Sequence, residues 1–187
     1  MRLFVALSPP PEGLAEVAEA VGSLGKDWPE LRWVAPETWH VTMAFLGEVG
    51  EGVLPGLGVR LARAAARYPP MTLSFAAGGT FPAAARARVV WLGVAGGETT
   101  LSRLAASLAA GARRAGADHA DRKPFHPHLT LARSRPRTGV DARPLIEGLS
   151  GFAGTPWLAD SVHLMRSHLG PVVRYETLDS WRLTGRG

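Results

Sequence analysis

The stretches His40-Val41-Thr42-Met43-Ala44 and His128-Leu129-Thr130-Leu131-Ala132 repeat one pattern, in which histidine and threonine alternate with apolar residues. Successive side chains of a β-strand point to opposite faces, so the histidine and threonine of each stretch share a face. The interleaved apolar side chains then point the other way, into the core. The pattern predicts two strands that each present an imidazole beside a hydroxyl on a surface backed by core.

The two copies stand far apart, one in each half of the chain. An internal duplication that produces two lobes with facing strands is the economical explanation. The alternative is that each histidine only caps a strand edge and forms local hydrogen bonds. A single His-x-Thr triplet would carry little weight, but two in the same apolar frame are a specific signal.

Apolar periodicity outside the repeat predicts both helices and strands, with a Gly/Pro loop after residue 76. Strands are expected at 2–8, 31–34, 39–46, 71–76, 88–94, 128–132, 158–165 and 172–178, and helices at 14–24, 54–68, 101–112 and 144–149. Several strands follow one another across short turns. This order favours an α+β fold with antiparallel sheets over a doubly wound parallel sheet.

Composition narrows the class of protein. The chain has 187 residues, 46% of them hydrophobic, which suits one domain with its own core. It has no cysteine, which excludes a disulfide framework, a thiol nucleophile and a thiolate metal site. No apolar run is long enough to span a membrane, and the first one, 3–7, is too short for a signal peptide. We therefore expect a cytoplasmic protein without a membrane segment.

The charge of the chain points to phosphate without deciding the matter. The formal net charge is +5, and every basic residue except Lys26 and Lys123 is arginine. The planar guanidinium fork suits phosphate oxygens, which favours a phosphate-bearing or nucleic-acid partner. A general bias toward alanine, glycine, proline and arginine explains the same numbers equally well.

Two histidines with pKa values near neutrality can share the two proton transfers of a reaction, one accepting a proton while the other donates one. Cleavage of a phosphodiester needs a base on the attacking oxygen and an acid on the leaving oxygen, on opposite sides of phosphorus. Threonine hydroxyls beside them would donate to the non-bridging phosphate oxygens. The sequence thus predicts a phosphodiester site built by both stretches.

The residues of both stretches and their flanks resemble the two-histidine phosphoesterases, and specifically the bacterial and archaeal RNA 2′,3′-cyclic phosphodiesterases, also called 2′-5′ RNA ligase-like proteins. The resemblance covers nearly the whole chain. It rests on Arg2–Leu7, Trp33–Glu37, the continuation Phe45–Glu48, Phe81-Pro82 with Arg86–Trp91, Pro127–Arg133, and Gly170-Pro171 with Tyr175.

The resemblance implies an α+β, bilobal fold in which two pseudo-symmetric antiparallel β-sheets with outer helices enclose a central cleft. Residues 1–187 would form a single bilobal phosphodiesterase domain, each lobe contributing one His-x-Thr motif. The implied reaction is hydrolysis of a 2′,3′-cyclic phosphate end to a 2′-phosphate, without metal or cofactor. The implied partner is RNA with such an end, tRNA-derived ends included, and the implied state is a monomer.

The resemblance also assigns roles to residues. His40 is expected to protonate the departing 3′ oxygen and His128 to activate water, while Thr42 and Thr130 hold the phosphate. Arg133 resembles the phosphate-contacting arginine of the family, and Phe45 is a candidate for the nucleoside pocket. Strict alternation places residue 133 opposite His128, so a bend must turn Arg133 into the cleft. The same alternation makes Phe45 equally a candidate for the core.

Several interpretations remain open at the level of sequence. Trp39 stands where a smaller aliphatic residue is typical of the family, and it belongs either to the cleft rim or to the core. Trp33 and Trp91 can likewise stack on bases or fill the core. His126 and His128, with His119 nearby, form an alternative zinc site. The basic residues Arg86, Arg88, Arg133, Arg135 and Arg137 form either a path for an RNA backbone or a solvated loop.

Three other functions compete with RNA cyclic phosphodiesterase activity. Ligation or cleavage of 2′-5′ linkages uses related chemistry in the reverse direction. A phosphodiesterase that acts on a small nucleotide would use the same histidines and threonines without any contact to a longer RNA. A non-catalytic protein that recognises RNA ends would bind the phosphate without turnover.

Overall fold

The computed structural model describes residues 1–186, which form a nine-stranded sheet in which every strand pair is antiparallel. The strands are β1 (Arg2–Leu7), β2 (Leu31–Trp33), β3 (Val41–Glu48), β4 (Met71–Phe81), β5 (Val89–Ala95), β6 (His128–Ser134), β7 (Trp157–Ala159), β8 (Ser161–His168) and β9 (Arg174–Arg182). The helices are α1 (Pro11–Leu24), α2 (Leu54–Ala65), α3 (Glu98–Ala115) and α4 (Arg143–Leu149). The expected α+β antiparallel class is confirmed.

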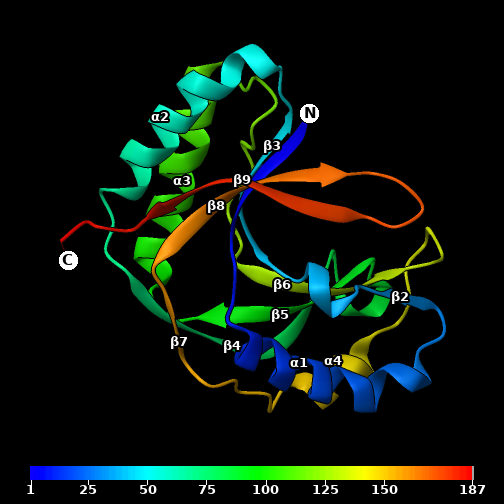
Figure 1. Cartoon of the computed structure of the whole chain (residues 1–187). Coiled ribbons are helices and arrows are strands. Elements are labelled where there is room, and N and C mark those ends of the chain that lie inside the picture. The colour runs from blue at the N-terminus through cyan, green and yellow to red at the C-terminus, as the bar shows by residue number, and fades with distance from the viewer. Residues whose placement is uncertain (187) are drawn as a thin grey trace.

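The sheet has two parts that meet at a single pair of residues. The order β7-β4-β5-β6, with β2 on β6, forms what we call the motif-2 half, and the order β3-β1-β8-β9 forms the motif-1 half. Only Val41 and Leu129 pair across the boundary between β3 and β6. Helices α2 and α3 cover the motif-1 half, whereas α1 and α4 lie against the motif-2 half (Figure 1).

The two halves of the sheet do not correspond to the two halves of the sequence. The motif-1 half combines β1 from the N-terminus with β8 and β9 from the C-terminus, because β1 pairs with both β3 and β8. The chain therefore crosses between the halves several times. The two motif strands meet edge to edge at one pair instead of facing each other.

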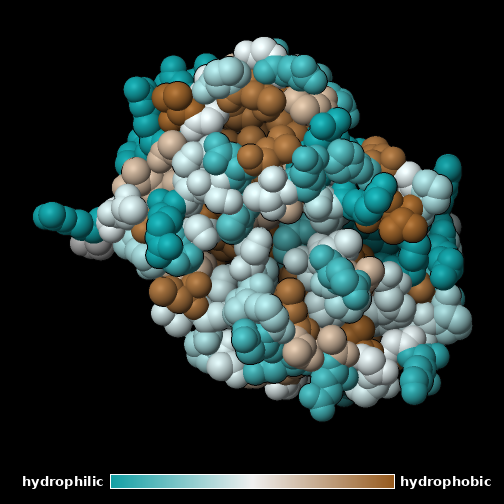
Figure 2. Space-filling view, viewed as in Figure 1, coloured by the Kyte–Doolittle hydropathy of each residue, from teal (hydrophilic) through white to brown (hydrophobic). Residues whose placement is uncertain are grey.

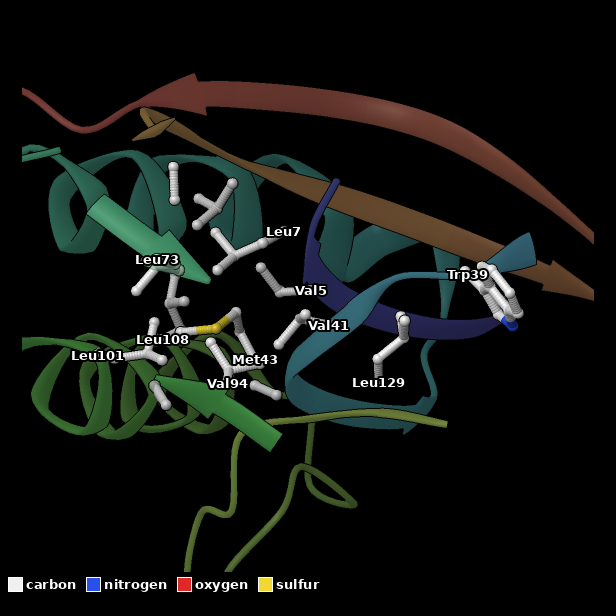
Figure 3. Close-up of a cluster of buried hydrophobic side chains, with 14 of the residues drawn as sticks. Val5, Leu7, Trp39, Val41, Met43, Leu73, Val94, Leu101, Leu108 and Leu129 are labelled. Atoms are coloured by element: carbon white, nitrogen blue, oxygen red, sulfur yellow. The ribbon is translucent and has the colours of Figure 1, made fainter. Parts of the chain in front are cut away.

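The core lies on the face of the sheet that the apolar residues of both motifs share. Val41, Met43, Leu129 and Leu131 are at most 3% exposed, as the alternation predicts. In Figure 3 Val41 and Met43 point toward side chains of β1, β5 and α3, among them Val5, Val94 and Leu108. Both histidine–threonine faces are therefore backed by packed side chains.

Two predicted boundaries are wrong, each for a structural reason. The predicted strand 158–165 divides at Asp160, because β7 pairs with β4 in one half and β8 pairs with β1 in the other. The predicted loop after residue 76 is instead a continuation of β4 through Gly78 and Gly79 to Phe81. A Cβ at Gly79 would overlap the ring of Trp91, so glycine there allows a close approach to that ring. No helix within residues 1–186 has the length and apolarity needed to cross a bilayer.

Candidate active site

The single β3–β6 pair brings the two motifs to one place. Because the strands are antiparallel and Val41 pairs with Leu129, His40 lies across from Thr130, and Thr42 lies across from His128. All four side chains line one cavity of about 370 Å3. Each imidazole thus has a threonine beside it on its own strand and another threonine across the junction.

The backbone holds both imidazoles in the same way. The Nδ1–H of His40 donates to the carbonyl oxygen of Thr38 at 2.8 Å, and the Nδ1–H of His128 donates to the carbonyl oxygen of His126 at 2.7 Å. A carbonyl oxygen can only accept, so each hydrogen bond requires the proton on Nδ1. The Nε2 atom of each neutral ring then carries the lone pair, which is the atom needed to accept or return a proton.

Different aromatic residues surround each imidazole. The His40 ring contacts Phe4 and Tyr175, with ring centroids 4.7 and 5.1 Å away. The His128 ring contacts Phe81 at 5.1 Å and Trp91 at 6.1 Å. These contacts come from β1 and β9 for His40 and from β4 and β5 for His128. Packing against rings restricts imidazole rotation and removes water from one side of each ring.

Burial lowers the pKa of both histidines, because removal from water disfavours the charged imidazolium. The carbonyl hydrogen bond opposes this effect at each site by favouring the protonated ring. The positive charge of His128, when protonated, further lowers the pKa of His40, and His126 and Arg133 do the same to His128. Both rings therefore favour the neutral form more than a free imidazole does.

A bulge in each motif strand decides where the residue after the motif points. In the β1–β3 ladder Ala6 pairs with Thr42 and Val5 with Ala44, so Met43 is an extra residue on β3. In the β5–β6 ladder Trp91 pairs with Thr130 and Val90 with Ala132, so Leu131 is extra on β6. An extra residue places two consecutive side chains in the core and reverses the alternation beyond it.

The bulges resolve the two open questions about alternation. Arg133 and Phe45 occupy equivalent positions after the two bulges, and both line the cavity with the histidines. The bend required for Arg133 is thus present in β6. The core interpretation of Phe45 is wrong, because its ring is only half-buried and the Arg2 guanidinium lies 5.0 Å from its centroid.

The structure brings all the sequence-predicted site residues to one cavity and adds others that the sequence reasoning did not assign. Arg2, Phe4 and Tyr175 also line it. They lie in β1 and β9, in stretches that carried the family resemblance but to which no role was assigned. Phe81 and Trp91, which contact His128, belong to such stretches as well; the sequence assigns no role to Phe81 and leaves Trp91 between base stacking and the core. Trp39 is 6% exposed and packs in the core while also closing one wall of the cavity, so it fills both of the places considered for it.

Other candidate residues lie outside this cavity. Arg86, Arg88, Arg135 and Arg137 do not line it, so only Arg133 of the basic set reaches the histidines. In the part of the chain that the structure describes, residues 1–186, no group of three or more His, Asp or Glu side chains is close enough to hold a metal ion. The zinc interpretation of His119, His126 and His128 therefore has no geometric support.

The rim of the cavity includes the tip of the β8–β9 hairpin. Leu169 and Val173 line the cavity and are 65% and 40% exposed, and Val172 between the two strands is 74% exposed. Figure 2 shows an apolar patch on the side of the molecule where this hairpin ends in Figure 1. The mouth of the cavity thus combines exposed apolar side chains with the guanidinium groups of Arg2 and Arg133.

The chain is similar to a known family and to several proteins that share one name. A family model described as the 2′-5′ RNA ligase superfamily matches residues 9–171. A Thermus thermophilus protein named RNA 2′,3′-cyclic phosphodiesterase is 37% identical over 198 aligned residues, covering 99% of this chain and 91% of that protein. A Geobacillus stearothermophilus protein of the same name is 29% identical over 97% of this chain, which spans only 57% of that relative's length.

Solved structures show the same fold. The Thermus thermophilus protein TT0787 superposes with a TM-score of 0.82 at 29% identity, covering 100% of both chains. Escherichia coli LigT in its apo form superposes with a TM-score of 0.76 at 30% identity, covering 98% of this chain and 97% of LigT. LigT has also been solved in complex with 3′-AMP.

Proposed function

Because the chain belongs to the 2′-5′ RNA ligase superfamily, we propose that it hydrolyses the 2′,3′-cyclic phosphate at an RNA end to a 2′-phosphomonoester. His40 and His128 act as the acid and the base. The observation that supports this most is the matched pair of imidazoles, each with Nδ1 tied to a carbonyl and both on one cavity. Two such rings, held apart from each other by separate strands, suit proton transfer at two oxygens of one phosphate.

In the proposed reaction, Nε2 of His128 takes a proton from water as the water oxygen bonds to phosphorus. The bond from phosphorus to O3′ breaks, and the proton on Nε2 of His40 passes to O3′. The products are a 3′-hydroxyl and a 2′-phosphomonoester. His40 is then neutral and His128 protonated, and exchange of protons with solvent restores the starting state. Imidazoles make both proton transfers, so the proposal uses no metal ion and no cofactor.

Thr42, Thr130 and Arg133 stabilise the phosphate in this proposal. Charge on the non-bridging oxygens increases as the bond to water forms, and hydroxyl and guanidinium donors favour that charge. The negative phosphate also raises the lowered pKa of the histidines, which helps His40 to hold its proton. Phe45 offers an apolar ring to the nucleoside beside the phosphate. Since Phe45 and Arg133 occupy equivalent positions, one motif supplies an apolar contact where the other supplies charge.

We further propose that residues 1–187 work as a single bilobal unit in which each half supplies one motif. The crossing of the chain between the halves supports this, because neither half is a continuous stretch of sequence. One chain holds both histidines, so a monomer is sufficient for the reaction.

The proposal is tested on a short RNA ending in a 2′,3′-cyclic phosphate, after treatment of the protein with a chelator. We expect turnover to a 2′-phosphate in wild type and a loss of at least about a hundredfold in kcat in both His40→Ala and His128→Ala. RNA affinity should stay close to that of wild type. His163→Ala is the matched control, because it removes an imidazole that lies outside the cavity.

The competing functions give different results in the same assay. Tight binding without turnover in wild type supports the non-catalytic protein. A chelator-sensitive reaction restored by zinc contradicts the two-histidine mechanism. Joining of an added 5′-hydroxyl RNA in preference to hydrolysis supports 2′-5′ ligation.

A further inference from the structure

A second cavity of about 630 Å3 shares Thr42 and His128 with the first. Its other walls come from α3, from Phe81 at the end of β4 and from residues 121–126, which precede β6. Ligand pockets for small molecules and cofactors have volumes of about 300–1,000 Å3, so this cavity is large enough for a nucleotide. The hydrolysis of a cyclic phosphate does not by itself require it, because the first cavity already contains both histidines and Arg133.

One wall of the second cavity is positively charged. Arg113, Arg122 and Lys123 line it, and Asp121 is the one carboxylate among its lining residues. The Oδ2 atom of Asp121 accepts a hydrogen bond from the backbone N–H of Phe45 at 3.3 Å, so this carboxylate is turned toward β3. Arg113 donates from Nη1 to the carbonyl oxygen of Asp121 at 2.7 Å, which fixes the chain just before Arg122. This wall suits a phosphate group.

A second part of the wall is aromatic. Phe81, Phe125 and His126 line the cavity, and the Phe81 and His126 rings meet edge to face with centroids 5.4 Å apart. Buried apolar residues also line the cavity, namely Met43 of β3 and Ala105 and Ala109 of α3. Base stacking on aromatic side chains tolerates any base, and combined with basic residues it is the usual way proteins hold single-stranded RNA.

We propose that the second cavity binds a second nucleotide unit, its base against the aromatic wall and its phosphate against Arg122 and Lys123. This inference rests on the proposed function and adds the length of RNA that the site recognises. The nucleotide has two possible sources: the residue that precedes the reacting end, or the end of a separate 5′-hydroxyl strand. Both present the same chemistry to the cavity.

The test measures kcat/KM for two substrates, a nucleoside 2′,3′-cyclic phosphate and a dinucleotide that ends in one. We expect wild type to prefer the dinucleotide by about tenfold, the scale of one stacked base. The double variant Arg122→Ala/Lys123→Ala should lose most of this preference, mainly through KM. The double variant Arg103→Ala/Arg114→Ala removes the same charge from exposed positions outside both cavities and should retain the preference.

A third arm separates the two sources. The cyclic mononucleotide is supplied together with a separate 5′-hydroxyl oligonucleotide. If the second strand is the source, its 5′ oxygen bonds to phosphorus as the bond to O3′ breaks, its proton passes to His128, and the proton of His40 passes to O3′. A joined product whose yield falls in Arg122→Ala/Lys123→Ala identifies the second strand. A preference seen only when the two nucleotides are covalently linked identifies the nucleotide that precedes the reacting end as the occupant of the second cavity.

The outcomes also separate this inference from the proposed function. If wild type hydrolyses both substrates equally well and joins no strand, the second cavity holds no nucleotide and the inference is overturned. Equal losses on both substrates in Arg122→Ala/Lys123→Ala overturn it as well, because a nucleotide site must discriminate by length. If wild type hydrolyses neither substrate and joins no strand, the proposed function itself fails.

Discussion

His40 and His128 receive the same support from the backbone but stand among different side chains. Each donates from Nδ1 to the carbonyl two residues earlier, and each is followed by a threonine and then by a bulge. Beyond the bulges the two strands differ, since Phe45 is apolar and Arg133 is charged. The shared backbone geometry sets the tautomer, whereas the neighbouring side chains distinguish the two sites.

The neighbours also differ in how they act on each imidazole. Burial is the largest cause of the lowered pKa at both histidines, but Arg133 lowers the pKa of His128 and is not among the causes at His40. The rings of Phe4 and Tyr175 contact His40, and those of Phe81 and Trp91 contact His128. A pair with equal backbone geometry can therefore hold unequal roles. Substitutions at and around the two histidines test that inequality.

The largest expected effect concerns the assignment of acid and base. On the natural substrate, which has an oxygen at the 3′ bridging position, we expect His40→Ala and His128→Ala each to lose at least about a hundredfold in kcat. On an analogue whose 3′ bridging oxygen is replaced by sulfur, His40→Ala should approach wild-type rates. A thiolate leaves without a proton, since thiols have pKa values near 8.5, far below those of alcohols. Single-turnover rates on both substrates measure the effect.

His128→Ala is the internal control for that experiment, because removal of the base should slow both substrates. If sulfur instead restores His128→Ala and leaves His40→Ala slow, the two roles are exchanged. If sulfur restores neither variant, proton donation to O3′ is not part of the rate-limiting step.

The next effect concerns the two equivalent positions after the bulges. Arg133→Ala should lower kcat/KM by about 10- to 100-fold, as expected for a hydrogen bond to a charged group. Phe45→Ala should lower it by about tenfold, through the loss of a stacked ring. The two variants should also differ in salt dependence, because only Arg133 neutralises a phosphate charge. Measurement of KM against salt concentration separates them.

Arg137→Ala serves as the control for Arg133→Ala, since it removes an exposed guanidinium that lines neither cavity. Equal salt slopes for Arg133→Ala and wild type contradict the phosphate contact. A larger loss of kcat/KM in Phe45→Ala than in Arg133→Ala contradicts the expectation that the charged contact contributes more than the apolar one.

A smaller effect concerns the aromatic residues beside His128. A Cβ at position 79 would overlap the Trp91 ring, so Gly79→Ala should reduce the free energy of unfolding by about 1–3 kcal/mol. Gly22→Ala, in α1, has open space around the added carbon and should raise it by about 0.5–1 kcal/mol. Denaturant unfolding followed by tryptophan fluorescence measures both. An unchanged stability in Gly79→Ala contradicts the close approach of Trp91.

The smallest effect concerns pH. Activity needs a neutral base and a protonated acid, and both histidines have pKa values below their ordinary value of 6.5, so kcat/KM should peak below pH 6.5. Removal of the positive charge in Arg133→Ala raises the pKa of His128. The acidic limb, where activity is lost as the base becomes protonated, should therefore move to higher pH. A pH profile of kcat/KM measures this, with Arg135→Ala as the control.

The alkaline limb gives the contrast between the two histidines. It follows deprotonation of His40, whose pKa owes no part of its shift to Arg133. A shift of the alkaline limb alone in Arg133→Ala contradicts the assignment of His128 as the base.

Much of this architecture could be predicted from the sequence, because it depends on short-range patterns. Alternation around His40 and His128 placed Val41 and Leu129 in the core and the imidazoles on the opposite face. Helical spacing located α3, whose Leu101, Leu104 and Leu108 are fully buried. The strand break at Asp160 could not be predicted in this way, since the residues on both sides have strand-like patterns and only their different partners, β4 and β1, separate them.

The residues that surround the two histidines could not be predicted from the sequence, for a similar reason. Phe4 and Tyr175 reach His40 because β1 and β9 belong to the same half of the sheet, although they come from opposite ends of the chain. Phe81 reaches His128 only because β4 continues through Gly78 and Gly79. Neither relation leaves a signal in the local pattern of residues.

The sequence alone predicted the residues of the proposed site, since side-chain type and the period-two alternation of a strand require no knowledge of partners. It also determined that both motifs are backed by core. Only the tertiary structure decided that β3 and β6 touch at Val41 and Leu129, which sets each histidine across from the other motif's threonine. The register of β3 on β1 and of β6 on β5 likewise produces the bulges that turn Phe45 and Arg133 into the cavity. Register depends on strands that are distant in sequence, and a shift of one residue reverses the face of every side chain that follows.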